Sequence, residues 1–160
     1  MNPLNTTELN QFSEQIVRDA AFGLLFLSIV LASNATLFIR IYMWFMKSCG
    51  KLVKAEPIDL ILLFVGAVLM MCLVQIASIL IWTAALYFTG LIGDLRMSML
   101  FSGSSYTTLG IFSDSLPKGW KSVAFYIAFS GLFSFAIATS SMMSMLAIVT
   151  KKLYRPLTRS

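Results

Sequence analysis

The sequence predicts an all-α membrane protein with three transmembrane helices and, between the second and third, a re-entrant pore helix and filter loop. Hydrophobic residues make up 58% of the 160 residues and charged residues only 12%, which is too apolar for a soluble core of this size. Three apolar runs exceed the roughly 20 residues with which a helix crosses about 30 Å of hydrocarbon. A short, hydroxyl-rich stretch that cannot cross lies between the last two runs.

The first predicted span covers residues 20–45 and follows a polar segment, residues 1–19. This segment holds three acidic side chains and one basic side chain, Arg18. A secretory signal peptide begins with basic residues instead. We therefore expect residues 1–19 to lie on the extracellular or periplasmic side and the first span to be retained.

The second and third predicted spans are an outer helix, residues 58–89, and an inner helix, residues 120–149. Lysines follow the first span, and a basic tail, residues 151–160, follows the third. Basic residues near helix ends favour the cytoplasmic side, and three crossings put both clusters on one side. We therefore expect an outside N-terminus and a cytoplasmic C-terminus.

The connection between the outer and inner helices must return to the side that it left. Asp94 is a candidate N-cap for a helix over about residues 94–106. At about 1.5 Å per residue such a helix covers only part of the hydrocarbon thickness. These lengths favour a helix that dips into the membrane, and together with the flanking spans it forms a predicted pore module, residues 58–150.

The loop after this short helix, about residues 107–114, reads Thr-Thr-Leu-Gly-Ile-Phe-Ser-Asp. Non-helical backbone at membrane depth is tolerated where protein or a water-filled cavity satisfies it. Hydroxyls and successive carbonyls can replace the water shell of a cation, so the loop is a candidate ion filter. An ordinary extracellular loop with Ser/Thr turn chemistry is the alternative.

From Trp82 to about Ala147 the chain resembles the two-helix pore module of the bacterial potassium channel family, in which a Thr-Thr-x-Gly-Tyr-Gly-Asp filter joins a pore helix to an inner helix. The resemblance covers about 40% of the chain. It rests on matches in the outer helix, pore helix, filter and inner helix: Tyr87, Gly90, Phe101, Ser102, Tyr106, Thr107, Thr108, Leu109, Gly110, Asp114 and Trp120.

The resemblance implies a homotetramer around one ion path, with the first span at the periphery against an outer helix. The implied path for a monovalent cation, K+ or Na+, is formed by Thr107, Thr108, Leu109, Gly110 and Ile111. The implied outer mouth is formed by Phe112, Ser113 and Asp114, and Gly131 is the implied hinge of the inner helix.

The second half of the loop departs from the family pattern, because one residue is added and the second glycine is absent. Phe112 at the position of that glycine would resist a positive φ by about 1 to 2 kcal/mol. Three outcomes stay open: a filter with fewer sites and weak selectivity, a remodelled filter that prefers potassium, or a loop that does not conduct.

The inner helix carries small polar residues at helical spacing, which can be interpreted in two ways. A wet vestibule below the filter would be lined by Ser134, Ile137, Ser141 and Ser144. Alternatively, small residues three or four apart allow close helix packing, and the row formed by Ser130, Ser134 and Ala138 fits that role. Asn34 and Gln75 in the other spans each require a hydrogen-bond partner within the protein.

The remaining residue types limit the classes of function that we expect. The chain has no histidine, no catalytic cysteine arrangement and no carboxylate cluster, so we expect neither an enzyme nor a bound cofactor. The basic tail predicts contact with anionic lipids and not with nucleic acid. A channel in a plasma membrane, the bacterial inner membrane, is the preferred function; a non-conducting scaffold or accessory protein that keeps the pore-module architecture is the alternative.

Overall fold

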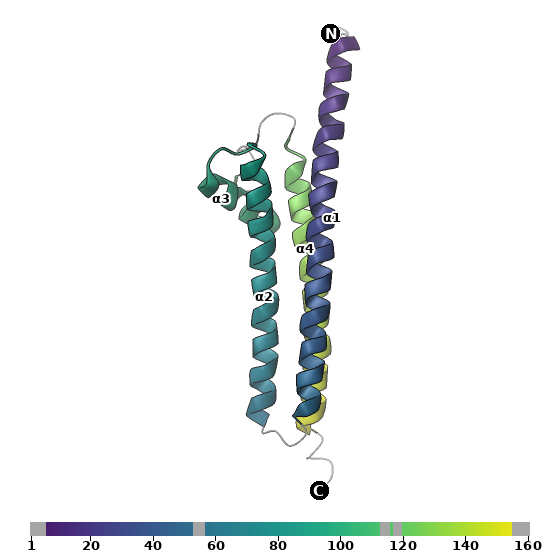
Figure 1. Ribbon diagram of the computed structural model, residues 1–160, viewed down its shortest axis with the longest axis vertical. Helices are drawn as coiled ribbons and strands as arrows, with labels where there is room; N and C mark the ends of the chain where they lie inside the picture. Colours follow the sequence, from purple (N-terminus) through teal and green to yellow (C-terminus); the bar gives the residue numbers. More distant parts are fainter. Residues whose placement is uncertain (1–5, 53–56, 113–115, 117–119, 155–160) are drawn as a thin grey trace. The chain divides into compact units, whose positions relative to one another are not determined.

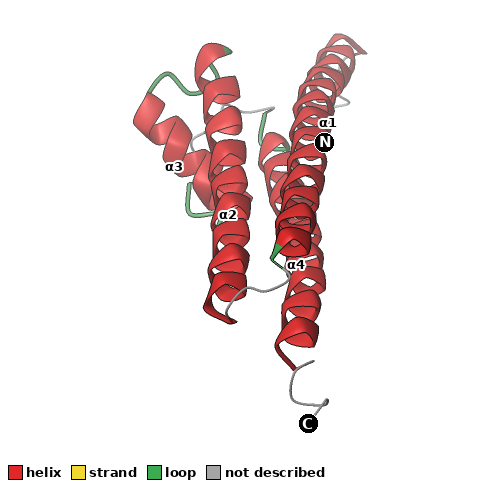
Figure 2. Ribbon diagram, turned by 60° about the horizontal axis from the view of Figure 1, so that its bottom comes forward, coloured by secondary structure: helices red, strands yellow, loops and turns green. Residues whose placement is uncertain are grey.

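The computed structural model of the protein describes residues 6–52, 57–112, 116 and 120–154. Four helices form this part of the chain, and no strand occurs in it (Figures 1 and 2). In chain order they are α1 (Thr6–Lys51), α2 (Pro57–Phe88), α3 (Leu95–Tyr106) and α4 (Val123–Tyr154). The prediction of an all-α fold is confirmed.

The three long helices have the length and composition of membrane-spanning helices, as predicted. They contain 46, 32 and 32 residues. At about 1.5 Å per residue each exceeds the roughly 30 Å thickness of the hydrocarbon. Depth and orientation in a membrane, including a re-entrant position of α3, stay predictions.

The helix ends follow local sequence signals. Pro57 opens α2, where its fixed φ suits the first turn and its missing N–H costs nothing. The first helix is longer than the predicted span and begins at Thr6, since residues 6–22 contain neither proline nor glycine to stop it. The last helix begins at Val123 and ends at Tyr154, two residues before a proline.

The chain divides into two compact units, and α1, α2 and α4 each contribute to both. The first unit comprises Met1–Leu31 and Ser78–Phe133, and the second comprises Ala32–Ala77 and Ser134–Ser160. The short helix α3 belongs entirely to the first unit. The candidate filter residues therefore lie in the first unit, whereas the hydroxyl-bearing second half of α4 lies in the second.

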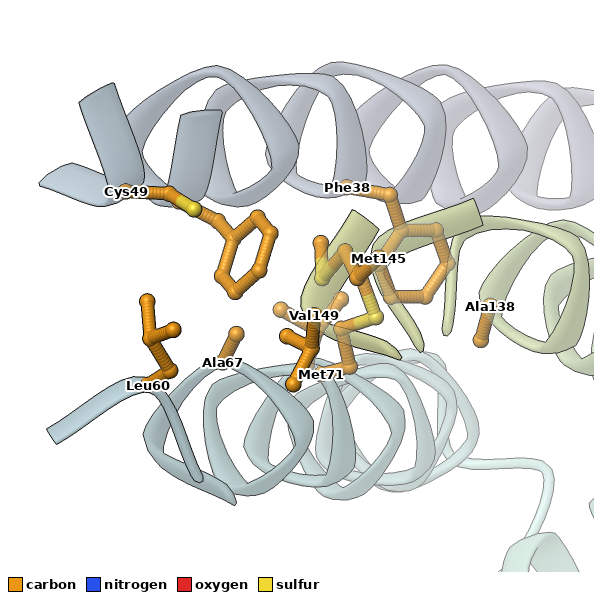
Figure 3. Close-up of a cluster of buried hydrophobic side chains, with 10 residues drawn as sticks. Phe38, Cys49, Leu60, Ala67, Met71, Ala138, Met145 and Val149 are labelled. Carbon is orange, nitrogen blue, oxygen red and sulfur yellow. The ribbon is translucent and has the colours of Figure 1, made fainter. Parts of the chain in front are cut away.

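The core of the second unit is formed by side chains from α1, α2 and α4 that point toward one another (Figure 3). Phe38 of α1 and Met145 of α4 are almost fully buried there, as is Met71 of α2. One buried polar contact joins two of these helices, because Asn34 Nδ2 of α1 donates a 2.6 Å hydrogen bond to Ser134 Oγ of α4. The expected partner of Asn34 is therefore a serine of the inner helix.

The core of the first unit surrounds the indole of Trp82, which is fully buried. Its Nε1 donates a 2.9 Å hydrogen bond to Ser130 Oγ of α4, and its ring lies 5.9 Å from the ring of Phe26 of α1. Phe101 and Tyr106 anchor α3 in the same cluster. In this unit α1 therefore contacts α2, and the peripheral position of the first span stays a prediction.

Candidate functional site

The candidate site begins with α3, which covers almost the same residues as the predicted pore helix, about 94–106. Asp94 is its N-cap, as predicted, and accepts a 3.1 Å hydrogen bond from the backbone N–H of Arg96. The 12 residues of the helix are mostly apolar in its first half, and three of the six in its second half are serines. One face, which includes Phe101 and Ser102, is completely buried, so the neighbouring helices fix the direction in which α3 ends.

The C-terminus of α3 closes with the hydrogen bonds of a Schellman motif. Thr107 is the C-cap residue. The N–H of Thr108 donates to the carbonyl of Ser105 over 3.0 Å, and the N–H of Leu109 donates to the carbonyl of Ser104 over 2.8 Å. The N–H of Gly110 also donates to Ser104, over 3.2 Å. The start of the predicted filter is therefore tied to the end of the helix.

This motif places a β-branched residue in a conformation that glycine normally supplies. Thr108 has a φ of 62° and is the one non-glycine residue with positive φ in the described part of the chain. Left-handed backbone costs an L-residue about 1–2 kcal/mol. Gly110 follows with a φ of 65°, which glycine adopts without that cost.

Phe112 avoids the strain that its alignment with a family glycine predicts. It is not among the described residues with positive φ, and its partly buried ring packs against the core of the first unit. The left-handed positions in the loop are instead Thr108 and Gly110. Ser113 and Asp114, two residues of the predicted outer mouth, lie outside the described residues.

The loop presents acceptor oxygens. Thr107 and Thr108 donate their hydroxyl hydrogens to the carbonyls of Gly103 and Thr107, each over 2.7 Å, so their oxygens keep lone pairs to offer. Among the described residues, no backbone N–H donates to the carbonyls of Thr108, Leu109 or Gly110. Residues 107 to 111 are exposed, which leaves room for water or a cation beside this segment.

An apolar cavity of about 550 Å³ lies beside the loop in the first unit. Leu109, Ile111 and Phe112 line one side of it, and Met99 and Leu100 of α3 line another. Leu109 and Ile111 are each 68% exposed. After the two threonines, the side chains of the predicted cation path up to Ile111 are apolar or, at Gly110, absent, so only main-chain oxygens could coordinate a cation there.

Gly131, the predicted hinge, lies within the continuous helix α4 and against the end of α3. A Cβ at this position would overlap the carbonyl oxygen of Tyr106 and lie 3.0 Å from its carbonyl carbon. Only glycine allows this approach of backbone to backbone. The structure supplies a packing reason for Gly131, and the hinge role stays a prediction.

The two interpretations of the inner-helix row apply to different residues. Ser130, Ser134 and Ala138 are buried, and the two serines accept the hydrogen bonds from Trp82 and Asn34. The packing alternative therefore describes this row. The other three candidates for pore lining occupy a groove of the second unit: Ile137, Ser141 and Ser144.

Sequence reasoning missed two determinants of the site, namely the strain at Thr108 and the contact between Tyr106 and Gly131. The C-cap could have been found from the end of the apolar pattern of α3, since the residue after a C-cap is commonly left-handed. No sequence signal marks Tyr106, because its carbonyl and not its side chain makes the contact.

The described residues contain no group of three or more Cys, Asp or Glu side chains placed to hold a metal ion. The main-chain and hydroxyl oxygens of residues 107–110 are of a type that suits hard monovalent cations. Comparison of the chain with protein-family models, with curated proteins and with solved structures finds no significant match.

Proposed function

We propose that the protein is the subunit of a homotetrameric membrane channel that passes monovalent cations, K+ or Na+, through residues 107–114. One observation carries this proposal: Thr108, Leu109 and Gly110 are exposed residues whose carbonyls accept no backbone N–H from the described residues. Carbonyls at membrane depth require a partner. A dehydrated cation is a partner that several such carbonyls can share.

The C-terminus of α3 adds to the attraction for a cation. The carbonyl end of a helix carries a partial negative charge, which stabilises a nearby cation by about 0.3–1 kcal/mol. The loop leaves α3 at this end, with Thr107 as the cap. The C-terminal end of α3 and the oxygens of the loop therefore both favour a positive charge.

A single chain supplies one such loop, so the proposal requires several copies. In an apolar stretch of 18 residues within each long helix, only 17–22% of the residues are buried against the rest of the chain. These helices therefore keep ample apolar surface for lipid and for neighbouring subunits. Four copies around an axis, with α4 inside, complete a ring of carbonyls. In this arrangement the N-terminus is outside, and the basic tail contacts anionic lipids of a bacterial inner membrane.

A non-conducting scaffold is the second candidate, and the contacts of the loop favour it. The N–H groups of Leu109 and Gly110 are both bound to Ser104, and Phe112 packs against the core of the first unit. A loop held in this way can serve packing alone. Its apolar side chains could contact a partner membrane protein.

Cation flux through the purified protein in liposomes decides between these functions. The protein is first shown to be tetrameric in detergent, and flux is then measured under a potassium gradient and under a sodium gradient. Flux that requires protein and depends on the cation supports the channel. A confirmed tetramer that passes neither ion contradicts it and supports the scaffold.

A further inference from the structure

A groove of about 200 Å³ lies between α1 and α4 in the second unit. Seven residues line it: Phe38, Ile39 and Tyr42 of α1 and Ile137, Ser140, Ser141 and Ser144 of α4. Three of the seven are serines, a fourth is a tyrosine, and the other three are apolar.

The hydroxyls of this groove present acceptors. Ser141 Oγ donates to the carbonyl of Ile137 over 2.9 Å, and Ser144 Oγ donates to the carbonyl of Ser140 over 3.0 Å. Their hydrogens are thus used within α4, and lone pairs remain. The Tyr42 hydroxyl makes no hydrogen bond to another described residue. Acyl chains would leave the Tyr42 hydroxyl unpaired, whereas water would pair with it and could also donate to the remaining lone pairs of Ser141 and Ser144.

Two contacts hold α1 beside α4, one before and one after the groove in the direction of the α1 chain. On one side, Asn34 donates to Ser134. On the other, the ammonium of Lys152 donates to the carbonyl of Cys49 in the last turn of α1, where a cation is favoured by the helix dipole. The wall that α1 contributes is therefore fixed to the helix proposed to line the ion path.

We infer that α1 and α4 together form the wall of a water-filled inner ion path, with the groove of Tyr42 and the serines as its wet surface. The inference rests on the proposed function, since it takes α4 as the inner helix. It assigns the first span a place beside the ions and not at the periphery.

Cysteine accessibility tests the inference. In a background with both native cysteines replaced (Cys49→Ser and Cys72→Ser), Ile39→Cys places a thiol in the groove. Leu37→Cys is the matched control, because Leu37 is also exposed, at 39%, and lies two residues away outside the groove lining. The liposome-reconstituted variants are treated with a membrane-impermeant cationic thiol reagent, and labelling is followed by mass spectrometry.

We expect Ile39→Cys to be labelled about tenfold faster than Leu37→Cys, because only a thiol in water ionises and meets the reagent. Ser144→Cys, on the opposite wall, should behave like Ile39→Cys and guards against a local folding defect in one variant. Equal labelling rates for Ile39→Cys and Leu37→Cys would overturn the inference, whether lipid or a second copy of the chain fills the groove.

The labelling and flux readouts separate failure of this inference from failure of the proposed function. If labelling is selective and also blocks cation flux, the groove belongs to the ion path. If flux occurs but labelling is not selective, the channel stands and the role of α1 is refuted. Selective labelling in a protein that carries no flux shows a wet groove, and it refutes the ion path together with the channel.

Discussion

The backbone of Gly131 in α4 lies directly against the carbonyl group of Tyr106 at the end of α3. The contact joins Tyr106, the last residue of α3, to a position in the first third of α4. Through it, the position of the candidate filter depends on the surface of α4. A side chain at position 131 would have to displace main chain, which cannot give way as a flexible side chain can.

Gly131→Ala should therefore destabilise the protein by about 1–3 kcal/mol, the usual cost of overpacking a tight contact. Gly66→Ala is the control, because Gly66 is also within a long helix and a Cβ there meets no atom within 4 Å. The control should be neutral or stabilising by up to about 1 kcal/mol. Denaturant midpoints in detergent measure both, and equal midpoints would refute the packing role.

Thr108→Gly should stabilise the fold by about 1 kcal/mol, because glycine relieves the left-handed strain at the helix C-cap. Thr107→Gly removes a hydroxyl one residue earlier, at a φ of −87°, where glycine offers no relief. It should be neutral or destabilising. Unfolding free energies of the two variants check the prediction, which fails if Thr108→Gly is no more stable than Thr107→Gly.

Asn34 and Ser134 should show a coupling energy of about 0.6 to 1.7 kcal/mol in a double-mutant cycle, the range found for hydrogen bonds between membrane helices. The cycle uses Asn34→Ala, Ser134→Ala and the double variant. Thr36→Ala replaces Asn34→Ala in the control cycle, since the Thr36 hydroxyl donates within its own helix to Ala32. Coupling as small as in the control would mean that the bond does not hold α1 to α4.

Gly110→Ala should reduce cation flux about tenfold, because a strain of about 1–2 kcal/mol would move the carbonyls proposed to bind the ion. The matched control is Gly90→Ala. Gly90 has a φ of 72° against 65° for Gly110, and both have open space at the Cβ position. Gly90→Ala should carry the same strain and leave the flux unchanged. Similar flux from the two variants would show that the loop is not the filter.

Local signals in the sequence predict where most of the helices lie. The apolar runs gave three spans, and the second agrees with α2 to within a residue at each end. Asp94 marked the start of α3 because an N-cap is a local interaction between a side chain and nearby N–H groups. The first helix begins at Thr6, before the predicted span 20–45, because a polar segment can continue a helix where neither proline nor glycine stops it.

Which faces of these helices meet depends on packing between helices and could not be predicted from the sequence. In water a buried face is distinguished by its hydrophobicity, but side chains facing lipid and side chains facing protein are equally apolar in a membrane. The spacing of Ser134, Ser141 and Ser144 therefore could not show that the first is buried against Asn34 while the others line a groove. The contact of Gly131 with Tyr106 and the strain at Thr108 depend on where the backbone of α3 ends, which is set by packing against other helices.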